Sequence, residues 1–305
     1  MLAIFLKTIP FFALIGLGWI AGRRRFMDAQ ATAALTRFVF YFPLPAMLFG
    51  FAATLPVADL FDPAFLAAYV LGSLAVWGLV LAVARLRALP GPEAAMEAHT
   101  AMTGNTGFLG VPMLVALLGP QAAGPVLMVL TTDMVVFSVL ITVIITALRS
   151  GRVAVGPLVL GVLRNPLIMA MVLGLLWSEL GLPVPQPARD FLSLLGGAAT
   201  PVALFAIGAS LANLEGSHFG PALWLSFAKL VLHPLAVAIT ALWLFPVERH
   251  AAGVMIAAAA LPVAGNVYIL ATYFGVAAHR VSTAILISTG VSIVTIPGII
   301  AWVLQ

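Results

Sequence analysis

The chain has no cysteine and very few charged residues. The absence of cysteine excludes disulfides, thiolate metal ligands and a thiol nucleophile. Charged residues make up only 8% of the 305 residues, whereas soluble globular domains carry about 25%. Hydrophobic residues make up 63%. We therefore expect an all-α integral membrane protein that lies almost entirely in the bilayer, without a soluble domain.

Apolar windows predict ten transmembrane helices, each near the 20 residues that cross about 30 Å of hydrocarbon. Barrel strands are excluded because they alternate in hydropathy and are about half as long. The first window has the length of a full span and its basic cluster follows it, so a cleaved signal peptide is not expected. The predicted spans are 2–21, 34–54, 64–86, 95–118, 121–148, 156–178, 190–212, 219–245, 250–273 and 281–304.

Arginines gather after the odd-numbered spans of the first half. They include Arg23–Arg25, the pair Arg85 and Arg87, and the pair Arg149 and Arg152, with Arg37 at the start of span 2. The positive-inside rule makes these loops cytoplasmic and places both termini outside a membrane, which we expect to be the bacterial inner membrane. This topology accounts for the net charge of +4, so no nucleic-acid partner is expected.

The two halves of the chain resemble each other. Pro45–Phe49 in span 2 parallels Pro201–Phe205 in span 7, and Pro10 parallels Pro166, both at an offset of 156 residues. These matches predict two repeats of five spans, residues 1–150 and 156–305. An odd number of spans forces the second copy into the opposite orientation, so the repeats are predicted to be inverted.

Spans 4 and 9 each contain a Gly-Asn pair with a proline nearby, in Gly104–Pro112 and Leu261–Leu270. Glycine and proline interrupt helices, and broken backbone at membrane depth is tolerated only inside protein or beside a wet cavity. Paired interruptions are the best sequence indication of a transporter's binding site. We predict that inversion brings the two breaks together as a crossing; the alternative is that each motif only kinks a packed helix.

A crossing of this kind suits an organic anion, because helix N-termini present free N–H groups and partial positive charge. The side-chain amides of the two asparagines can donate and accept hydrogen bonds, and hydroxyl groups lie nearby. The candidate substrate-binding residues from these motifs are Gly104, Asn105, Thr106, Gly107, Pro112, Pro262, Gly265, Asn266 and Tyr268.

Asp133, Lys229 and His233 fall inside predicted spans. Charges at membrane depth are costly, so each is a functional hypothesis. We expect Asp133 and Lys229 near the crossing, where they balance charge or carry a coupling proton. The alternatives are a structural Asp133–Lys229 ion pair and a hydrogen-bonded core role for His233. His99 is expected at the membrane interface.

The sequence resembles the auxin efflux carrier family, which includes bacterial malonate-transporter-like members and plant auxin carriers. The resemblance rests on Phe42–Phe49, on Gly104–Pro112 and on Leu261–Asn266, and it extends over essentially the whole chain. It implies the fold of NhaA-type antiporters and bile-acid symporters, with crossed broken helices in spans 4 and 9. It also implies a scaffold of spans 1, 2, 6 and 7 and a transport domain of spans 3–5 and 8–10, which move against each other in an elevator cycle. The prolines at the crossing would be Pro112 and Pro262.

These observations favour a secondary transporter of a small organic anion, malonate-like, coupled to protons or working as a uniporter, without a cofactor, a metal or catalysis. Its partners would be the anion, protons, the lipid bilayer and a second copy bound through the scaffold helices. A sodium-coupled symporter is the alternative within transport. Two other classes stay open: an intramembrane serine hydrolase using Ser210 of Gly208-Ala209-Ser210 with His233, and a membrane sensor without transport.

Overall fold

The computed structural model describes residues 2–55, 62–150, 155–214, 216 and 218–304. Within these ranges every regular element is helical, and one isolated antiparallel bridge joins Gly104 to Val263. The predicted cytoplasmic loop that contains Arg152 falls outside the described residues. The helices of the first half are α1 (Leu2–Arg23), α2 (Ala29–Tyr41), α3 (Pro43–Ala52), α4 (Pro63–Leu86), α5 (Gly91–Met102), η2 (Thr106–Gly110), α6 (Val111–Leu118), η3 (Pro120–Ala122), α7 (Ala123–Thr131), η4 (Thr132–Phe137) and α8 (Ser138–Ser150).

The second half is helical in the same way. Its elements are α9 (Val155–Leu163), α10 (Pro166–Glu179), α11 (Gln186–Gly197), α12 (Ala199–Ala212), α13 (Phe219–Phe227), η5 (Ala228–Leu232), α14 (His233–Ile239), η6 (Thr240–Leu244), α15 (Arg249–Ala259), α16 (Gly265–Phe274) and α17 (Ala278–Val303).

In the part of the chain that the structure describes, seven helical segments are long and apolar enough to cross a bilayer, and each overlaps one of the predicted spans. The length and apolar composition of these helices are those of a protein that spans the membrane. The segments are Phe5–Arg23, Ala29–Ala52, Pro63–Leu86, Pro120–Arg149, Gln186–Ala212, Phe219–Leu244 and Ala278–Val303.

Each of the other three predicted windows contains two shorter helices with a break between them. Window 95–118 contains α5 and the pair η2 and α6, window 156–178 contains α9 and α10, and window 250–273 contains α15 and α16. The break between α9 and α10 falls at Asn165-Pro166, where Asn165 caps α10 by accepting from the N–H of Leu167 at 2.9 Å. This third interruption was not among the breaks predicted from the sequence, which were those of spans 4 and 9.

Some predicted boundaries were wrong by one turn of helix or more. Span 2 begins at Ala29 rather than 34, because Asp28 caps the helix and accepts a hydrogen bond from the N–H of Ala31 at 2.7 Å. Span 4 begins at Gly91 rather than 95. This second shift moves His99 from the expected interface to the last turn of α5, where it is buried.

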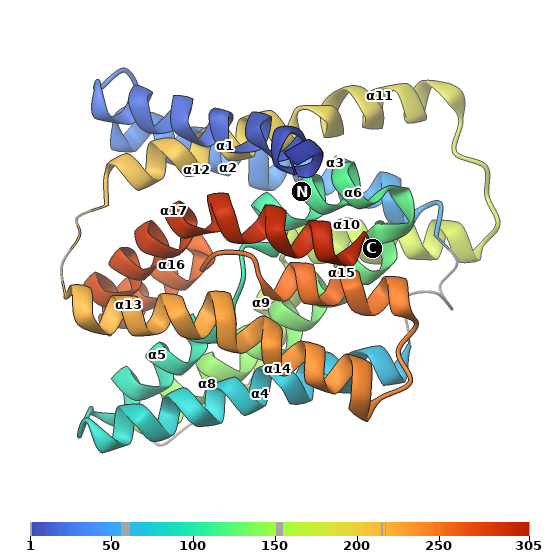
Figure 1. The fold of residues 1–305 in the computed structure, drawn as a ribbon. Helices are drawn as coiled ribbons and strands as arrows, with labels where there is room; N and C mark the ends of the chain where they lie inside the picture. The colour runs from blue at the N-terminus through green and yellow to red at the C-terminus, as the bar shows by residue number, and fades with distance from the viewer. Residues whose placement is uncertain (1, 56–61, 151–154, 215, 217, 305) are drawn as a thin grey trace.

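The helices form two groups, and α6, α9, α15 and α16 lie between them (Figure 1). α1, α2, α11 and α12 lie along the top of Figure 1, and α4, α5, α8 and α14 lie along the bottom. In the first group α1 packs along α12, and α3 packs against α10 and α11. In the second group α4 packs against α5 and α14, and α13 packs against α17.

Two close helix contacts in the first group repeat each other. A side chain on Gly18 of α1 would collide with the carbonyl oxygen of Phe205 on α12, and one on Gly174 of α10 would collide with that of Phe49 on α3. Gly18 and Gly174 are 156 positions apart, and so are Phe49 and Phe205. The offset that relates the sequence motifs therefore also relates these contacts. Small residues allow such close approach between membrane helices.

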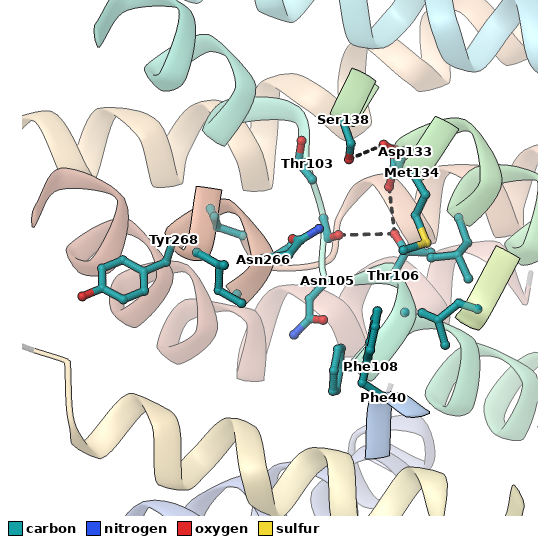
Figure 2. Close-up of a pocket in the computed structure, with 18 of the residues that line it drawn as sticks. Phe40, Thr103, Asn105, Thr106, Phe108, Asp133, Met134, Ser138, Asn266 and Tyr268 are labelled. Atoms are coloured by element: carbon teal, nitrogen blue, oxygen red, sulfur yellow. Dashed lines mark hydrogen bonds between the residues drawn. The ribbon is translucent and has the colours of Figure 1, made fainter. Parts of the chain in front are cut away.

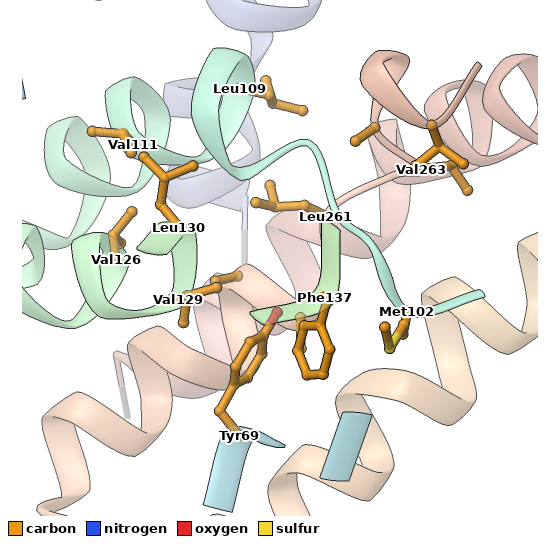
Figure 3. Close-up of a cluster of buried hydrophobic side chains, with 14 of the residues drawn as sticks. Tyr69, Met102, Leu109, Val111, Val126, Val129, Leu130, Phe137, Leu261 and Val263 are labelled. Carbon is orange, nitrogen blue, oxygen red and sulfur yellow. The ribbon is translucent and has the colours of Figure 1, made fainter. Parts of the chain in front are cut away.

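Buried apolar side chains surround the two breaks (Figure 3). Met102 and Leu109 flank the first break, and Leu261 and Val263 belong to the second. The rings of Tyr69 and Phe137 meet edge to face with centroids 6.1 Å apart. This packing shields the non-helical backbone of the breaks from lipid, as hydrocarbon surroundings require.

An ionic cluster joins α4, α5 and α17. Glu97 of α5 is fully buried and accepts from Arg87 at 2.8 Å and from Arg280 at 2.5 Å. Arg280 also pairs with Glu93. These bonds tie the first half of the interrupted span to its neighbours, and the sequence analysis gave no role to either glutamate.

Candidate functional site: the crossing of two interrupted helices

The two breaks lie side by side and are joined by backbone hydrogen bonds. The N–H of Asn105 donates to the carbonyl of Pro262 at 2.9 Å, and the N–H of Ala264 donates to the carbonyl of Thr103 at 3.2 Å. Gly104 and Val263 form the antiparallel bridge between them. The N–H of Val263 is satisfied by the hydroxyl of Ser288 on α17 at 3.1 Å. Some polar backbone groups released by the breaks thus pair with each other at the crossing.

A cavity of about 660 Å³ opens beside the crossing. Volumes of about 300–1,000 Å³ are usual for small-molecule sites. Its walls come from both breaks and from α2, η4, α8, α10, α12 and α17. η2 and α16 both begin at this cavity. The first N–H groups of a helix lack acceptors within the helix, but the N–H of Thr106, which begins η2, donates to the carbonyl of Gly104 at 2.8 Å. The cavity therefore combines polar groups of the two breaks with largely apolar walls.

Asn105 and Asn266 both line the cavity, one from each break (Figure 2). Asn105 is only 8% exposed, and the structure, which describes it fully, gives its side-chain amide no hydrogen-bond partner. Figure 2 shows that amide beside the rings of Phe40 and Phe108. Asn266 is exposed to the cavity. An unpaired amide at this depth is a group that a ligand would satisfy.

Three glycines of the motifs line the cavity, whereas the ring of Tyr268 points away from the two asparagines. Gly104, Gly107 and Gly265 line the cavity together with Thr106. Tyr268 lies at the edge of the cavity, and Figure 2 shows its ring directed away from the two asparagines. Its hydroxyl is therefore turned away from the crossing.

The two motif prolines shape the crossing without lining this cavity. Pro262 contributes the carbonyl that Asn105 binds. Pro112 is buried near the start of α6 and lines a second cavity of about 690 Å³ between α3, α6 and α11.

Asp133 is buried in the cavity wall and its carboxylate is bound by two hydroxyl groups. Tyr69 donates to Oδ1 at 2.7 Å and Thr106 donates to Oδ2 at 3.1 Å, which links η4 to α4 and to the first break. The π-helical turn of η4 aims the carboxylate at the break, and its backbone carbonyl accepts from the hydroxyl of Ser138 at 3.0 Å. Such wide turns often mark functional sites in helices.

Lys229 and His233 lie behind the crossing and do not line the cavity. Lys229 is in the π-helical turn η5, and Pro234 explains that turn because it removes the donor that a regular helix requires. Lys229 donates to the carbonyl of Ala259, the last residue of α15. A cationic group is favoured at the C-terminal end of a helix, where partial negative charge collects.

His233 is held on both ring nitrogens. Its Nε2 lies 2.9 Å from the hydroxyl of Ser73, and its Nδ1 lies 3.0 Å from Lys229 Nζ and 3.2 Å from the carbonyl oxygen of Ala259. This is the hydrogen-bonded core role that the sequence analysis left open. The partner of His233 is Ser73 rather than Ser210, so the structure does not form the serine–histidine pair that the hydrolase hypothesis needs.

The structure, which describes both residues, places no direct ion pair between Asp133 and Lys229. The three ion pairs among the described residues belong to the cluster around Glu97 and Arg280. Asp133 faces the cavity side of the first break, whereas Lys229 faces its rear. The Nζ of Lys229 lies 3.3 Å from the position that a Cβ atom on Gly104 would occupy. The structural ion pair considered from the sequence is therefore not formed.

Sequence reasoning missed three residues of the site. Tyr69 and Ser73 were overlooked because single hydroxyl groups in an apolar helix carry no pattern. Arg37 was assigned to membrane topology, yet it lines the cavity. Because α2 begins at Ala29, Arg37 lies about two turns inside the helix. The cap at Asp28 was the signal that could have placed it there.

A helical membrane protein with two interrupted helices that meet beside a polar cavity has the features of a transport protein. The comparisons with known proteins agree. The family described as "Membrane transport protein" matches residues 3–157 and 152–300, and this chain belongs to it; it is the auxin efflux carrier family that the sequence resembles.

Two relatives match over nearly their full lengths. A protein of Rhizobium meliloti (strain 1021) named "Putative malonate transporter" is 29% identical over 303 residues, which cover 96% of this chain and 93% of that protein. A protein of Escherichia coli (strain K12) named "Uncharacterized transporter YfdV" is 26% identical over 304 residues, which cover 95% of this chain and 94% of that protein.

Proposed function

We propose that this chain is a secondary transporter that binds a small carboxylate at the crossing. The observation that supports this most directly is the side-chain amide of Asn105, which lines the cavity beside the crossing without a hydrogen-bond partner, on a residue that is only 8% exposed. The N–H groups that begin α16 would bind a carboxylate, and the amides of Asn105 and Asn266 would orient it. The relative named for malonate supports a malonate-like substrate.

The transport cycle that we propose is an elevator movement between two domains in a chain of ten spans and two inverted repeats. The group containing α1, α2, α3, α10 and α12 would be the scaffold, and the group containing α4, α5, α13, α14 and α17 would move with the crossing. The matching contacts of Gly18 and Gly174 at an offset of 156 residues support the repeat. The membrane would be the bacterial inner membrane, with both termini outside.

Asp133 is the residue that we propose for ion coupling. It is the only acidic side chain among the described residues that line the cavity, and Thr106 connects it directly to the first break. Protonation of Asp133 would weaken the hydrogen bonds that it accepts from Tyr69 and Thr106. Because Thr106 belongs to the first break, proton binding and substrate binding would affect the same part of the crossing. Uptake with and without a sodium gradient at fixed pH separates this mechanism from sodium symport.

Uptake of radiolabelled malonate into proteoliposomes tests the binding site. Asn105→Ala and Asn266→Ala should each reduce uptake more than tenfold, as expected for loss of a hydrogen bond to a charged ligand worth about 1.5–3 kcal/mol. Asn213→Ala is the matched control, because Asn213 lies at the end of α12 outside the cavity and bonds to the carbonyl of Ala209. Uptake at the wild-type rate by either cavity variant would refute the site.

A further inference from the structure

Of the described residues that line the cavity at the crossing, two carry a charged side chain. One is Asp133, whose carboxylate already accepts bonds from Tyr69 and Thr106. The other is Arg37, for which the described part of the chain provides no acidic partner. Lys229 is close to the crossing but faces away from the cavity. Among the described residues that line the cavity, Arg37 is therefore the only cation.

Arg37 is an exposed residue of α2 that lines the cavity. It shares one face of α2 with Thr36 and Phe40, and all three line the cavity. The ring of Phe40 stacks on that of Phe108, with centroids 6.4 Å apart and planes 10° from parallel. Phe108 follows Asn105 by three positions in the opposite wall. The aromatic stack thus brings the face of α2 that carries Arg37 up to the break that carries Asn105.

We propose that Arg37 binds a second carboxylate of the substrate and makes the site selective for short dicarboxylates over monocarboxylates. This inference rests on the proposed function, in which the first carboxylate is held at the crossing. The planar guanidinium binds a carboxylate through two parallel hydrogen bonds. One carboxylate would bind to the breaks and the other to α2, so the ligand would join the two walls of the cavity.

Equilibrium binding to the purified full chain in detergent tests the proposal, with malonate and propionate as probes. The two acids have three carbons each and differ in the second carboxylate. Wild type should bind malonate more tightly than propionate. Arg37→Gln should weaken malonate binding about tenfold to a hundredfold, as loss of a charged hydrogen-bonded pair predicts, and should leave propionate binding within about twofold. Arg37→Lys should recover only part of the malonate affinity, because an ammonium lacks the planar fork.

Arg24→Gln is the matched control. Arg24 is exposed in the turn after α1 and does not line the cavity, so its loss removes the same charge without touching the site. The proposal is overturned if wild type does not prefer malonate, if Arg37→Gln weakens both acids equally, or if Arg24→Gln has the same effect as Arg37→Gln. Asn105→Ala distinguishes failure of the Arg37 proposal from failure of the proposed function. It should weaken the binding of both malonate and propionate, and if it weakens the binding of neither, the crossing is not the binding site.

Discussion

The Nζ atom of Lys229 lies 3.3 Å from the position that a Cβ atom on Gly104 would occupy. A buried amine thus supports the first break from behind, while the front of the same break faces the cavity. Lys229 also binds the end of α15, so this one side chain stabilises both interrupted spans. The crossing depends on a residue without a side chain at position 104.

Enlarging Gly104 should therefore destabilise the crossing. A Cβ atom there would also lie 3.3 Å from the carbonyl of Ala258 and 3.4 Å from Leu261, and the two further methyl groups of valine would not fit. Gly104→Val should cost about 1–3 kcal/mol through overpacking and lower the thermal midpoint in detergent. The control is Gly265→Val in the other motif, where a Cβ atom would meet nothing within 4 Å. Equal midpoints for the two variants would contradict this account.

Tyr69 should stabilise the fold through its bond to Asp133. Tyr69→Phe removes the donor at 2.7 Å and leaves Oδ1 of a buried carboxylate without it. The expected cost is about 1.5–3 kcal/mol, measured by denaturation in mixed micelles. Tyr273→Phe is the control, because Tyr273 is 81% exposed and should change stability by less than about 0.5 kcal/mol. A Tyr69→Phe protein as stable as wild type would show that Asp133 finds another donor.

The repeated glycine contacts predict equivalent effects in the two halves. Gly18→Ala and Gly174→Ala each place a methyl group against the backbone or side chains of a neighbouring helix, so both should lower the thermal midpoint by several degrees, about 1–3 kcal/mol of overpacking. Gly16→Ala on the same helix as Gly18 should have no such cost, because a Cβ atom there meets nothing within 4 Å. If Gly174→Ala behaves like Gly16→Ala, the two contacts are not equivalent.

Glu248 should make stability depend on acid pH. It precedes α15 and accepts from the N–H groups of His250 at 2.9 Å and Ala251 at 2.8 Å, and these bonds lower the pKa of its carboxyl group. A lowered folded pKa means that the stabilisation is fully present above the pKa of the unfolded chain, about 4.3 for glutamate, and is lost as pH falls through the folded pKa.

Glu248→Gln should therefore lower the thermal midpoint at pH 7, by about 1 kcal/mol for a helix cap, and the difference from wild type should shrink below about pH 4. Thermal unfolding followed between pH 3 and pH 7 measures it. Glu179→Gln, at the exposed end of α10, controls for the loss of a carboxylate elsewhere. A difference that is independent of pH would contradict the role of the carboxylate.

The sequence by itself determined that this is a helical membrane protein and where two of its helices break. The scarcity of charge and the length of the apolar runs leave no other class, because every backbone group in lipid must find a partner within a helix or a barrel. The Gly-Asn motifs identified the breaks because glycine and proline disfavour a continuous helix whatever surrounds them.

Only the tertiary structure decided which side chains share the cavity. Asp133, Lys229 and Arg37 all lie within helices, but Asp133 and Arg37 face the cavity, whereas Lys229 faces the rear of the crossing. That choice depends on how each helix is rotated about its axis. The π-helical turns at Asp133 and Lys229 shift this rotation, so a period of 3.6 residues does not predict it.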